Sequence, residues 1–359
     1  MKNFPFPIFK TKIDGDETTF KLEDPVERKK YFKHKAGREL QFLRDFLKYR
    51  TFMGFLLGKK NSGKGTYSKL FIEALGQNQV AHISVGDVVR NIHASLGKEE
   101  EKKQLLDFLN RRYRGFIGID KILDVVEGRD TKTLLPTEVI LALVEREIDA
   151  LGRKAIFIDG FPRNLDQISY SLYFRALMGY REDPDFFVFI DVPETIIDAR
   201  MRGRVICPTC HTPRHPKLLR TKSVGYDKDT EEFYLQCDNT VCPAIGSRMV
   251  PKEGDELGIE AIRERIEADD QIMKKLLNLE GVPKIMLHNA LPVSRAKEFV
   301  DDYEITPAYI YSLDDKSGEV VVAEEPWTVR DENGEPSYSL LPAAVVLAFI
   351  KQTAKILGF

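Results

Sequence analysis

The sequence predicts an α/β protein in which a parallel β-sheet is wrapped by helices. Three apolar runs have the length of buried strands, at residues 51–57, 155–158 and 186–190. A helical pattern follows each run, beginning at Lys64, after Asn164 and at Pro193. A glycine-rich segment joins the first run to its helix. Strands that alternate with helices in this way are typical of parallel sheets.

The composition is that of an ordinary soluble globular protein. The 359 residues are 43% hydrophobic and 31% charged, enough for one large core or two modest ones. The net charge of -2 gives no global positive field, so we expect no nucleic acid partner. The amino terminus carries early prolines and charges, and no run approaches the ~20 apolar residues that span a bilayer. We therefore expect a cytoplasmic protein without a membrane partner.

Two long segments interrupt the alternation, at residues 87–152 and 205–257. Insertions at the carboxyl ends of strands are where ligands bind in such sheets. Residues 1–50 precede the first strand as an extension, with an amphipathic helix expected around 38–49. The two interruptions are therefore the first places to look for a binding site.

The carboxyl-terminal tail has a pattern of its own. We expect strands at 309–312 and 319–322, forming a small sheet with Trp327. An apolar helix is expected from Pro342, with its apolar face on the core or on another subunit. We expect a monomer, and a dimer through this tail is the alternative.

A phosphate-binding loop is predicted after the first strand. Residues Gly58 to Thr66, GKKNSGKGT, match G-x-x-x-x-G-K with a glycine before the threonine. The glycines allow a tight turn whose amide groups face phosphates at a helix N-terminus, and Lys64 adds a mobile charge. A glycine turn with an exposed lysine is the alternative, and the flanking strand and helix disfavour it. The expected donor-phosphate contacts are Gly58, Asn61, Ser62, Gly63, Lys64, Gly65 and Thr66.

A second anion site is predicted from two later turns. In HISVGDVVR, the small turn Ser84, Val85, Gly86 precedes Asp87 and Arg90, and such a turn can hold a second phosphate.

The other turn follows the second apolar run, in IDGFPRNLDQ. Asp159 can order the waters around Mg²⁺, and Arg163, after the Gly160 turn, can pair bidentately with phosphate oxygens. Gln167 can read a base edge, because an amide both donates and accepts. A capped turn with a surface ion pair for Arg163 is the alternative.

The four cysteines have metal-ligand spacing. Cys207 and Cys210 form C-x2-C, and after 26 residues Cys237 and Cys242 form C-x4-C. Four thiolates can surround Zn²⁺ tetrahedrally, and such a closed shell makes the ion structural. His211 and His215 are alternative ligands, which we favour less.

These motifs together resemble adenylate kinase and its nucleoside monophosphate (NMP) kinase relatives over about residues 51–300. The resemblance rests on GKKNSGKGT, ISVGDVVR, LLPTEV, IDGFPRNLDQ and DVPETIIDARMRGR. It implies a P-loop three-layer fold with a parallel sheet core, a helical NMP-binding insertion and a zinc-binding lid. The implied segments are a core of 51–86, 153–204 and 258–303, an NMP-binding insertion at 87–152 and a lid at 205–257, with extensions at 1–50 and 304–359.

The resemblance also implies residue roles. Lys64, Arg163, Arg204 and Arg265 would serve catalysis, and Arg200 and Arg204, four apart on one helical face, would hold the donor nucleotide. The acceptor AMP would be bound by Ser84, Val85, Gly86, Arg90, Leu135, Gly160, Arg163, Gln167 and Arg265. Asp87 and Asp159 would organise Mg²⁺ and its waters.

The chain departs from the family pattern at three places. Lys60 and Asn61 stand where the loop usually has proline and glycine, and Val85 replaces a threonine. The segment 248–257 lacks the usual arginine followed by two aspartates, and Asp255 and Glu256 are its nearest acids. The residues that close the lid are therefore not fixed by the resemblance.

The expected reaction is direct in-line phosphoryl transfer from ATP to AMP with Mg²⁺, giving two ADP. A UMP or CMP kinase is one alternative, although such relatives usually carry asparagine at the position of Gln167. A non-enzymatic nucleotide-sensing or nucleic-acid-binding zinc protein is another. It would not need Arg90, Arg163, Arg200, Arg204 and Arg265 around one site.

Overall fold

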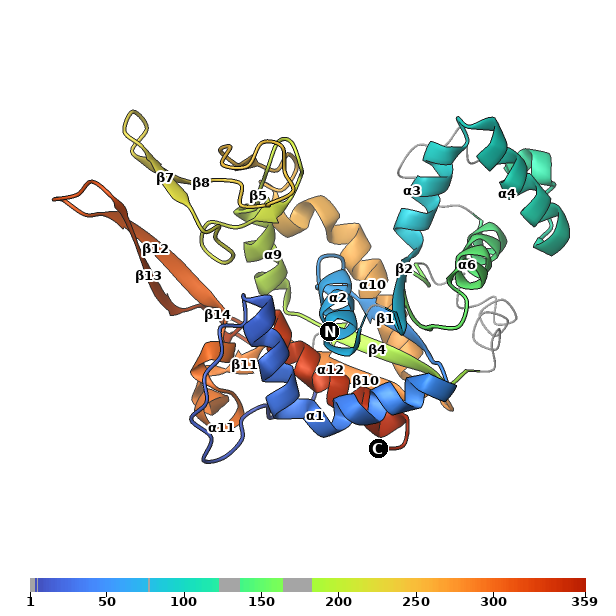
Figure 1. Cartoon of the computed structure of the whole chain (residues 1–359), viewed down its shortest axis with the longest axis horizontal. Coiled ribbons are helices and arrows are strands. Elements are labelled where there is room, and N and C mark those ends of the chain that lie inside the picture. The colour runs from blue at the N-terminus through green and yellow to red at the C-terminus, as the bar shows by residue number, and fades with distance from the viewer. Residues whose placement is uncertain (1–3, 5, 77, 123–135, 164–182) are drawn as a thin grey trace.

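A five-stranded parallel sheet forms the centre of the molecule (Figure 1). The computed structural model describes residues 4, 6–76, 78–122, 136–163 and 183–359. The strands are β1 (Met53–Gly58), β2 (Val80–Ser84), β3 (Ala155–Asp159), β4 (Asp185–Asp191) and β10 (Lys284–His288). They pair in the order β10-β4-β1-β3-β2, and every pair is parallel. The predicted fold class is confirmed.

Helices cover both faces of the sheet because its strands alternate apolar side chains between two cores. Phe52 and Leu56 belong to one core, whereas Met53, Phe55 and Leu57 belong to the other. The first core includes α1 (Pro25–Tyr49), α2 (Lys64–Leu75), α9 (Glu194–Arg202) and α12 (Pro342–Ile356). The second includes α3 (Val85–Ser95), α4 (Glu99–Arg112), α6 (Thr137–Leu151) and α10 (Arg263–Leu277).

Most predicted core elements appear where the pattern indicated, but the first helix is longer. We expected it around 38–49, and it begins at Pro25 because the Asp24 carboxylate accepts from the amides of Val26 and Glu27. A kink with non-helical angles at Ala36 lies inside it. The helix predicted after Asn164 lies outside the described residues.

A buried carboxylate joins the amino-terminal segment to the chain beyond residue 300. Glu304 is fully buried and accepts from Thr11 Oγ1 at 2.6 Å, Tyr31 Oη at 2.5 Å and Lys35 Nζ at 2.9 Å. These donors replace the hydrogen bonds that the carboxylate would otherwise make to water. The division of the chain into domains stays a prediction, but both ends are packed into one core.

The expected tail strands form a long hairpin. Strands β12 (Pro307–Leu313) and β13 (Val320–Pro326) are antiparallel, and they include the predicted runs at 309–312 and 319–322. Trp327 is buried directly after this hairpin, in the first core. A second small sheet comprises β11 (Leu291–Pro292), β14 (Thr328–Arg330) and β15 (Pro336–Tyr338). Short helices η2 (Val293–Arg295), α11 (Ala296–Phe299) and η3 (Asp302–Glu304) lie between β11 and β12.

The cysteine segment (residues 205–257) consists of short strands. They are β5 (Val205–Ile206), β6 (Pro213–Arg214), β7 (Val224–Asp227), β8 (Glu232–Leu235) and β9 (Val250–Pro251), and η1 (Gly258–Ile262) follows them. Figure 1 shows this segment on the opposite side of the sheet from α3, α4 and α6. Among the helices that the structure describes, none is both long and apolar enough to cross a membrane.

One carboxylate in the core sheet makes stability depend on pH. Burial, and then the neighbouring Asp183, raise the pKa of Asp185 from 3.8 to about 7. The folded chain therefore holds a proton between pH 4 and 7 that the unfolded chain releases. The free energy of unfolding should fall as pH rises through this window.

We predict that Asp185→Asn removes this loss of stability at higher pH. The variant should exceed the wild type in stability by on the order of 3 kcal/mol at pH 8, and the difference should shrink toward pH 4. Chemical unfolding at both pH values measures it. Asp229→Asn, at an exposed carboxylate, is the control. Equal differences at pH 4 and pH 8 would contradict the prediction.

Candidate functional site

The phosphate loop runs from the end of β1 to the start of α2, and its path requires glycine at two positions. A Cβ on Gly58 would lie 2.7 Å from the carbonyl oxygen of Ile190. Gly63 caps α2 with φ of 95°, a left-handed conformation that favours glycine. The first amides of α2 are therefore presented at the carboxyl edge of the sheet, where an anion can meet them.

Lys64 lies over this loop. Its Nζ donates to the carbonyls of Gly58 at 2.8 Å and Lys59 at 3.1 Å, and it lies 3.9 Å from Asp159 Oδ1. Burial lowers the pKa of Lys64, and Asp159 partly offsets this effect. The ammonium group is thus held in a partly desolvated position where an added anion would stabilise its charge.

The two predicted acceptor-site turns meet at the side chain of Arg163. A Cβ on Gly86 would lie 2.8 Å from Arg163 Nη2 and 3.4 Å from Arg90 Nη1. A Cβ on Gly160 would lie 2.9 Å from the same Arg163 nitrogen. Two guanidinium groups from different elements therefore converge on one glycine turn, as a phosphate site requires.

Arg265 extends this group from α10. Its Nη1 donates to the carbonyl of Arg163 at 3.3 Å, and its Nη2 lies 2.7 Å from Asp269 Oδ1. We call Lys60, Lys64, Arg90, Arg163 and Arg265 the cation cluster. Burial and then Arg265 lower the pKa values of both Lys60 and Arg163. Mutual repulsion of this kind makes the cluster a site for a polyanion.

The predicted magnesium-binding acids flank the cluster. Asp159 ends β3 beside Lys64, and Asp87 lies in the first turn of α3, where its amide donates to Ser84 Oγ at 3.3 Å. Burial opposes ionisation of Asp87, but contacts with Ser84 and Arg90 outweigh it and lower its pKa. The Val85 side chain is buried in the second core, so only its backbone can face a ligand.

The expectation that Arg200 and Arg204 share one helical face is wrong. Helix α9 ends at Arg202, and the chain then enters β5, so Arg204 takes another direction. Its Nη2 donates to Asp255 Oδ1 at 2.8 Å. Arg200 Nη2 instead donates to Ser339 Oγ at 2.9 Å. In this arrangement the two arginines have separate protein partners.

The residues of segment 248–257, where the lid-closing contacts were left open, also have partners within the protein. Asp255 binds Arg204 and lies 3.8 Å from Lys252 Nζ, whereas Arg248 lies 2.7 Å from Asp227 within the cysteine segment. The carbonyl of Glu256 accepts from Arg202 at 3.1 Å. Asp255 is therefore the acid of this segment that contacts a predicted donor-site arginine.

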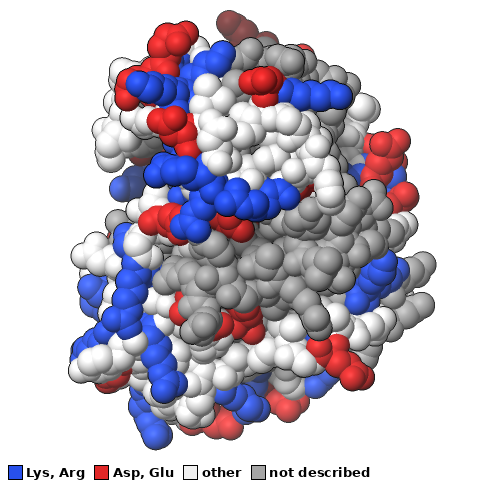
Figure 2. Space-filling model, turned by 90° about the vertical axis from the view of Figure 1, so that its right-hand side faces the viewer, with Lys and Arg blue, Asp and Glu red and all other residues white. Residues whose placement is uncertain are grey.

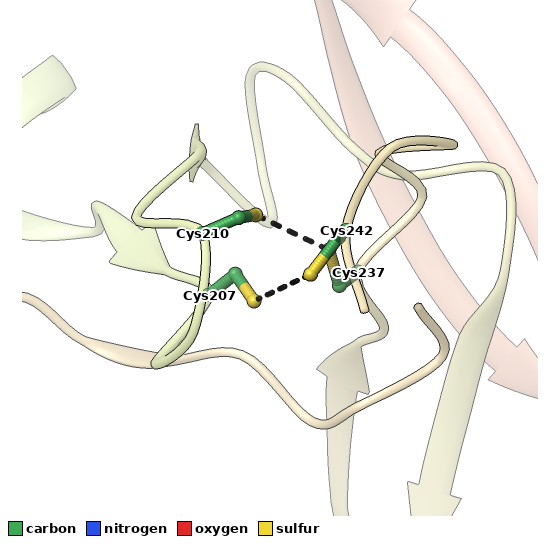
Figure 3. Close-up of side chains that lie close together, drawn as sticks. All are labelled: Cys207, Cys210, Cys237 and Cys242. Atoms are coloured by element: carbon green, nitrogen blue, oxygen red, sulfur yellow. Dashed lines mark hydrogen bonds between the residues drawn. The ribbon is translucent and has the colours of Figure 1, made fainter. Parts of the chain in front are cut away.

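The four cysteines form one compact cluster (Figure 3). Their sulfur atoms all lie within 4.8 Å of one another, with Cys207 to Cys242 at 3.9 Å and Cys210 to Cys237 at 3.7 Å. Four sulfurs bound tetrahedrally at the usual zinc distance lie about 3.8 Å apart. The donor set and its geometry therefore fit Zn²⁺, and the predicted cluster of four cysteines is confirmed.

The alternative histidine ligands have other contacts. The His215 Nδ1 atom accepts from the amide of Leu218 at 3.2 Å, and its Nε2 lies 3.0 Å from the carbonyl of Ala199. His211 is not part of the group of metal-binding atoms found among the described residues. Two predicted acceptor-site residues, Leu135 and Gln167, lie outside the described residues.

The cysteine segment also contacts the β12–β13 hairpin. Tyr311 Oη donates to the carbonyl of Pro216 at 2.5 Å, and the Tyr309 amide donates to the carbonyl of Lys217 at 2.8 Å. The rings of Tyr311 and Phe233 lie 5.7 Å apart. The segment is therefore attached to the tail as well as to α9.

Sequence reasoning missed two charged residues of the site. Lys59 is only 2% exposed, and its Nζ lies 3.0 Å from Glu332 Oε1 and 3.3 Å from Glu194 Oε1. No local signal links these positions. Asp269 could have been found, because its spacing of four from Arg265 on a helix is typical of an ion pair.

The charge distribution agrees with a local anion site. On the face shown in Figure 2, basic and acidic side chains of the described residues lie beside one another. The cation cluster is thus a local feature of the sheet edge. This arrangement favours a small polyanion over an extended nucleic acid.

Several known adenylate kinases are similar in sequence to this chain. No family model matches the chain. The adenylate kinase of Mesoplasma florum is 31% identical over 185 residues, covering 51% of this chain and 74% of that protein. The adenylate kinase of Clostridium acetobutylicum is 29% identical over 224 residues, covering 62% and 83%. That of Bacillus subtilis is 29% identical over 189 residues, covering 51% and 73%.

We predict that the purified chain contains one zinc ion, which Cys210→Ser releases. The described core of the cysteine segment is small, so metal loss should also unfold it. Elemental analysis and limited proteolysis measure the two effects. His211→Asn is the matched control, since His211 has a positive φ that asparagine tolerates. Unchanged zinc content in Cys210→Ser would reject the four-cysteine site.

Proposed function

The chain belongs to the adenylate kinase family, and we propose that it transfers a phosphoryl group reversibly from ATP to AMP, giving two ADP. The observation that carries this proposal is the convergence of Arg90 and Arg163 on Gly86, with Lys64 of the phosphate loop close enough to interact electrostatically with Arg163. One loop would bind only one nucleotide. A second cationic turn beside the loop supports a reaction between two nucleotides.

On the donor side, the loop amides and Lys64 would hold the β and γ phosphates of ATP. Arg200 and Arg204 would contact the donor nucleotide, Arg200 while keeping its hydrogen bond to Ser339. Mg²⁺ would neutralise phosphate charge, and the Asp159 and Asp87 carboxylates offer the oxygen ligands that this ion or its waters prefer. Asp159 already faces the loop, beside Lys64.

On the acceptor side, Arg90 and Arg163 would hold the AMP phosphate above the Gly86 turn. Arg265, which donates to the Arg163 carbonyl, would neutralise charge on the group in transfer. Gln167 would read the adenine edge and Leu135 would line its pocket. These last two roles rest on the sequence alone.

The reaction needs positioning more than covalent chemistry. An AMP phosphate oxygen attacks the γ phosphorus, and the bond from that phosphorus to the β–γ bridging oxygen breaks. The electron pair stays on the ADP that leaves. The cation cluster would align the two phosphate chains and stabilise the charge on the transferred group. We expect no covalent enzyme intermediate.

The segments around the site would exclude water. We propose that residues 87–152 close over AMP and that residues 205–257 close over ATP as a lid, with zinc stabilising the lid. The contacts of Arg204 with Asp255 support this assignment, because they join the lid to the end of α9. The Cys₄ shell would take no part in the chemistry.

We predict that AMP is the preferred acceptor. With ATP and Mg²⁺ fixed, ADP formation should have a higher kcat/KM with AMP than with CMP or UMP, because residue 167 is the glutamine of the adenine-specific relatives and not the asparagine of the pyrimidine-specific ones. A coupled assay with each nucleotide measures this preference. Faster turnover with CMP or UMP would replace the assignment with a pyrimidine nucleotide kinase.

Removing the loop lysine tests the donor site. Lys64→Ala should lower kcat/KM by about 10²- to 10³-fold, the usual effect of losing one preorganised charge-stabilising group. Lys69→Ala, on the exposed side of the same helix, is the matched control. Full activity in Lys64→Ala, with the thermal midpoint unchanged, would indicate that the loop serves only as a binding module.

A further inference from the structure

A short part of the carboxyl-terminal tail lies against the donor half of the site. We call residues 328–341, which contain β14 and β15, the donor clamp. Thr195 Oγ1 of α9 donates to the carbonyl of Arg330 at 2.7 Å. Two further contacts join the clamp to Lys59 of the phosphate loop and to Arg200. All three partners belong to the phosphate loop or to α9, the helix that carries Arg200.

The Lys59 contact fixes the beginning of the loop. Burial opposes the charge of Lys59, but Glu332 and then Glu194 outweigh it and raise its pKa. The lysine therefore stays charged between a carboxylate of the clamp and one of α9. Its own carbonyl accepts from Lys64 at 3.1 Å. A shift of the Lys59 backbone would consequently move the catalytic lysine.

The Arg200 contact is the end of a buried chain of hydrogen bonds. Arg200 donates to Ser339, the hydroxyl of Ser339 lies 3.2 Å from Asn289 Oδ1, and Asn289 Nδ2 donates to Tyr67 Oη at 2.8 Å. Ser339 is fully buried and Asn289 is 1% exposed. The Tyr67 ring lies 3.2 Å from the position of a Cβ on Gly63. These hydrogen bonds, together with the packing of Tyr67 against Gly63, connect the phosphate loop to Arg200.

We propose that the donor clamp positions the ATP side of the active site, with Ser339 orienting Arg200 and Glu332 holding Lys59. This inference rests on the proposed kinase function and adds positioning residues from a segment beyond the resemblance. Neither residue needs to touch the nucleotide. A guanidinium group that is already oriented loses less rotamer entropy when ATP binds. Loss of this orientation should therefore weaken the binding of ATP.

Removal of the Ser339 hydroxyl tests the proposal. Ser339→Ala should raise the KM for ATP and the Kd for ATP alone by about five- to tenfold, the usual worth of one hydrogen bond, with the KM for AMP unchanged. Ser339→Thr keeps a hydroxyl and should restore part of the ATP affinity. In an Arg200→Ala background, Ser339→Ala should have no further effect on ATP binding.

A neighbouring buried hydroxyl provides the control. Thr306 is buried, and its Oγ1 lies 3.5 Å from Ser339 Oγ. Thr306→Val removes a similar group without removing the partner of Arg200, so both KM values should stay unchanged. A purely structural role for this region would give Thr306→Val and Ser339→Ala the same kinetic effect, and that result would overturn the proposal.

Glu332→Gln gives a second test on a partly exposed turn. Its loss of charge should raise the KM for ATP about threefold or more, whereas Glu335→Gln on the same exposed turn should not. Unchanged ATP affinity in Glu332→Gln and Ser339→Ala would refute the clamp while leaving the kinase assignment intact. A wild-type chain that forms no ADP from ATP and AMP would refute the kinase assignment itself.

Discussion

Repulsion among the basic side chains at the carboxyl edge of the sheet is the constraint on which the rest of the structure depends. Burial and then the charge of Arg265 lower the pKa values of Lys60 and Arg163, and burial lowers that of Lys64, which Asp159 and Asp269 partly offset. A rigid scaffold is needed to hold these like charges close together, and a bound polyanion would neutralise them. The parallel strands and the glycine turns that end them provide that support.

The tail is part of this support. Helix α12 packs in the first core beside α1 and α2, and the donor clamp connects the phosphate loop to Arg200. The β12–β13 hairpin contacts the cysteine segment through Tyr309 and Tyr311. Any movement of the lid must therefore carry this hairpin or break these contacts. The phosphate loop, the lid and the tail are consequently coupled through ordinary hydrogen bonds and packing.

The core and the metal cluster could be predicted because their signals are local. Apolar runs fix the strands, glycine spacing fixes the loop, and paired cysteines fix the ligand set. The start of α1 could also have been predicted from Asp24 and Pro25, although we expected the helix only from about residue 38. By contrast, the ion pair of Lys59 and Glu332 joins residues 273 positions apart, which no periodicity reveals. Spacing alone also misplaced Arg204, because it does not show that α9 ends at Arg202.

The central claim is that two nucleotides meet across one cation cluster. Calorimetric titration with a dinucleotide of two adenosines joined by five phosphates tests this most directly. One molecule should bind per chain and displace both ATP and AMP, because its phosphates would extend from Lys64 to Arg90 and Arg163. Binding that displaces ATP but leaves AMP bound, or that takes up two molecules per chain, would contradict the account.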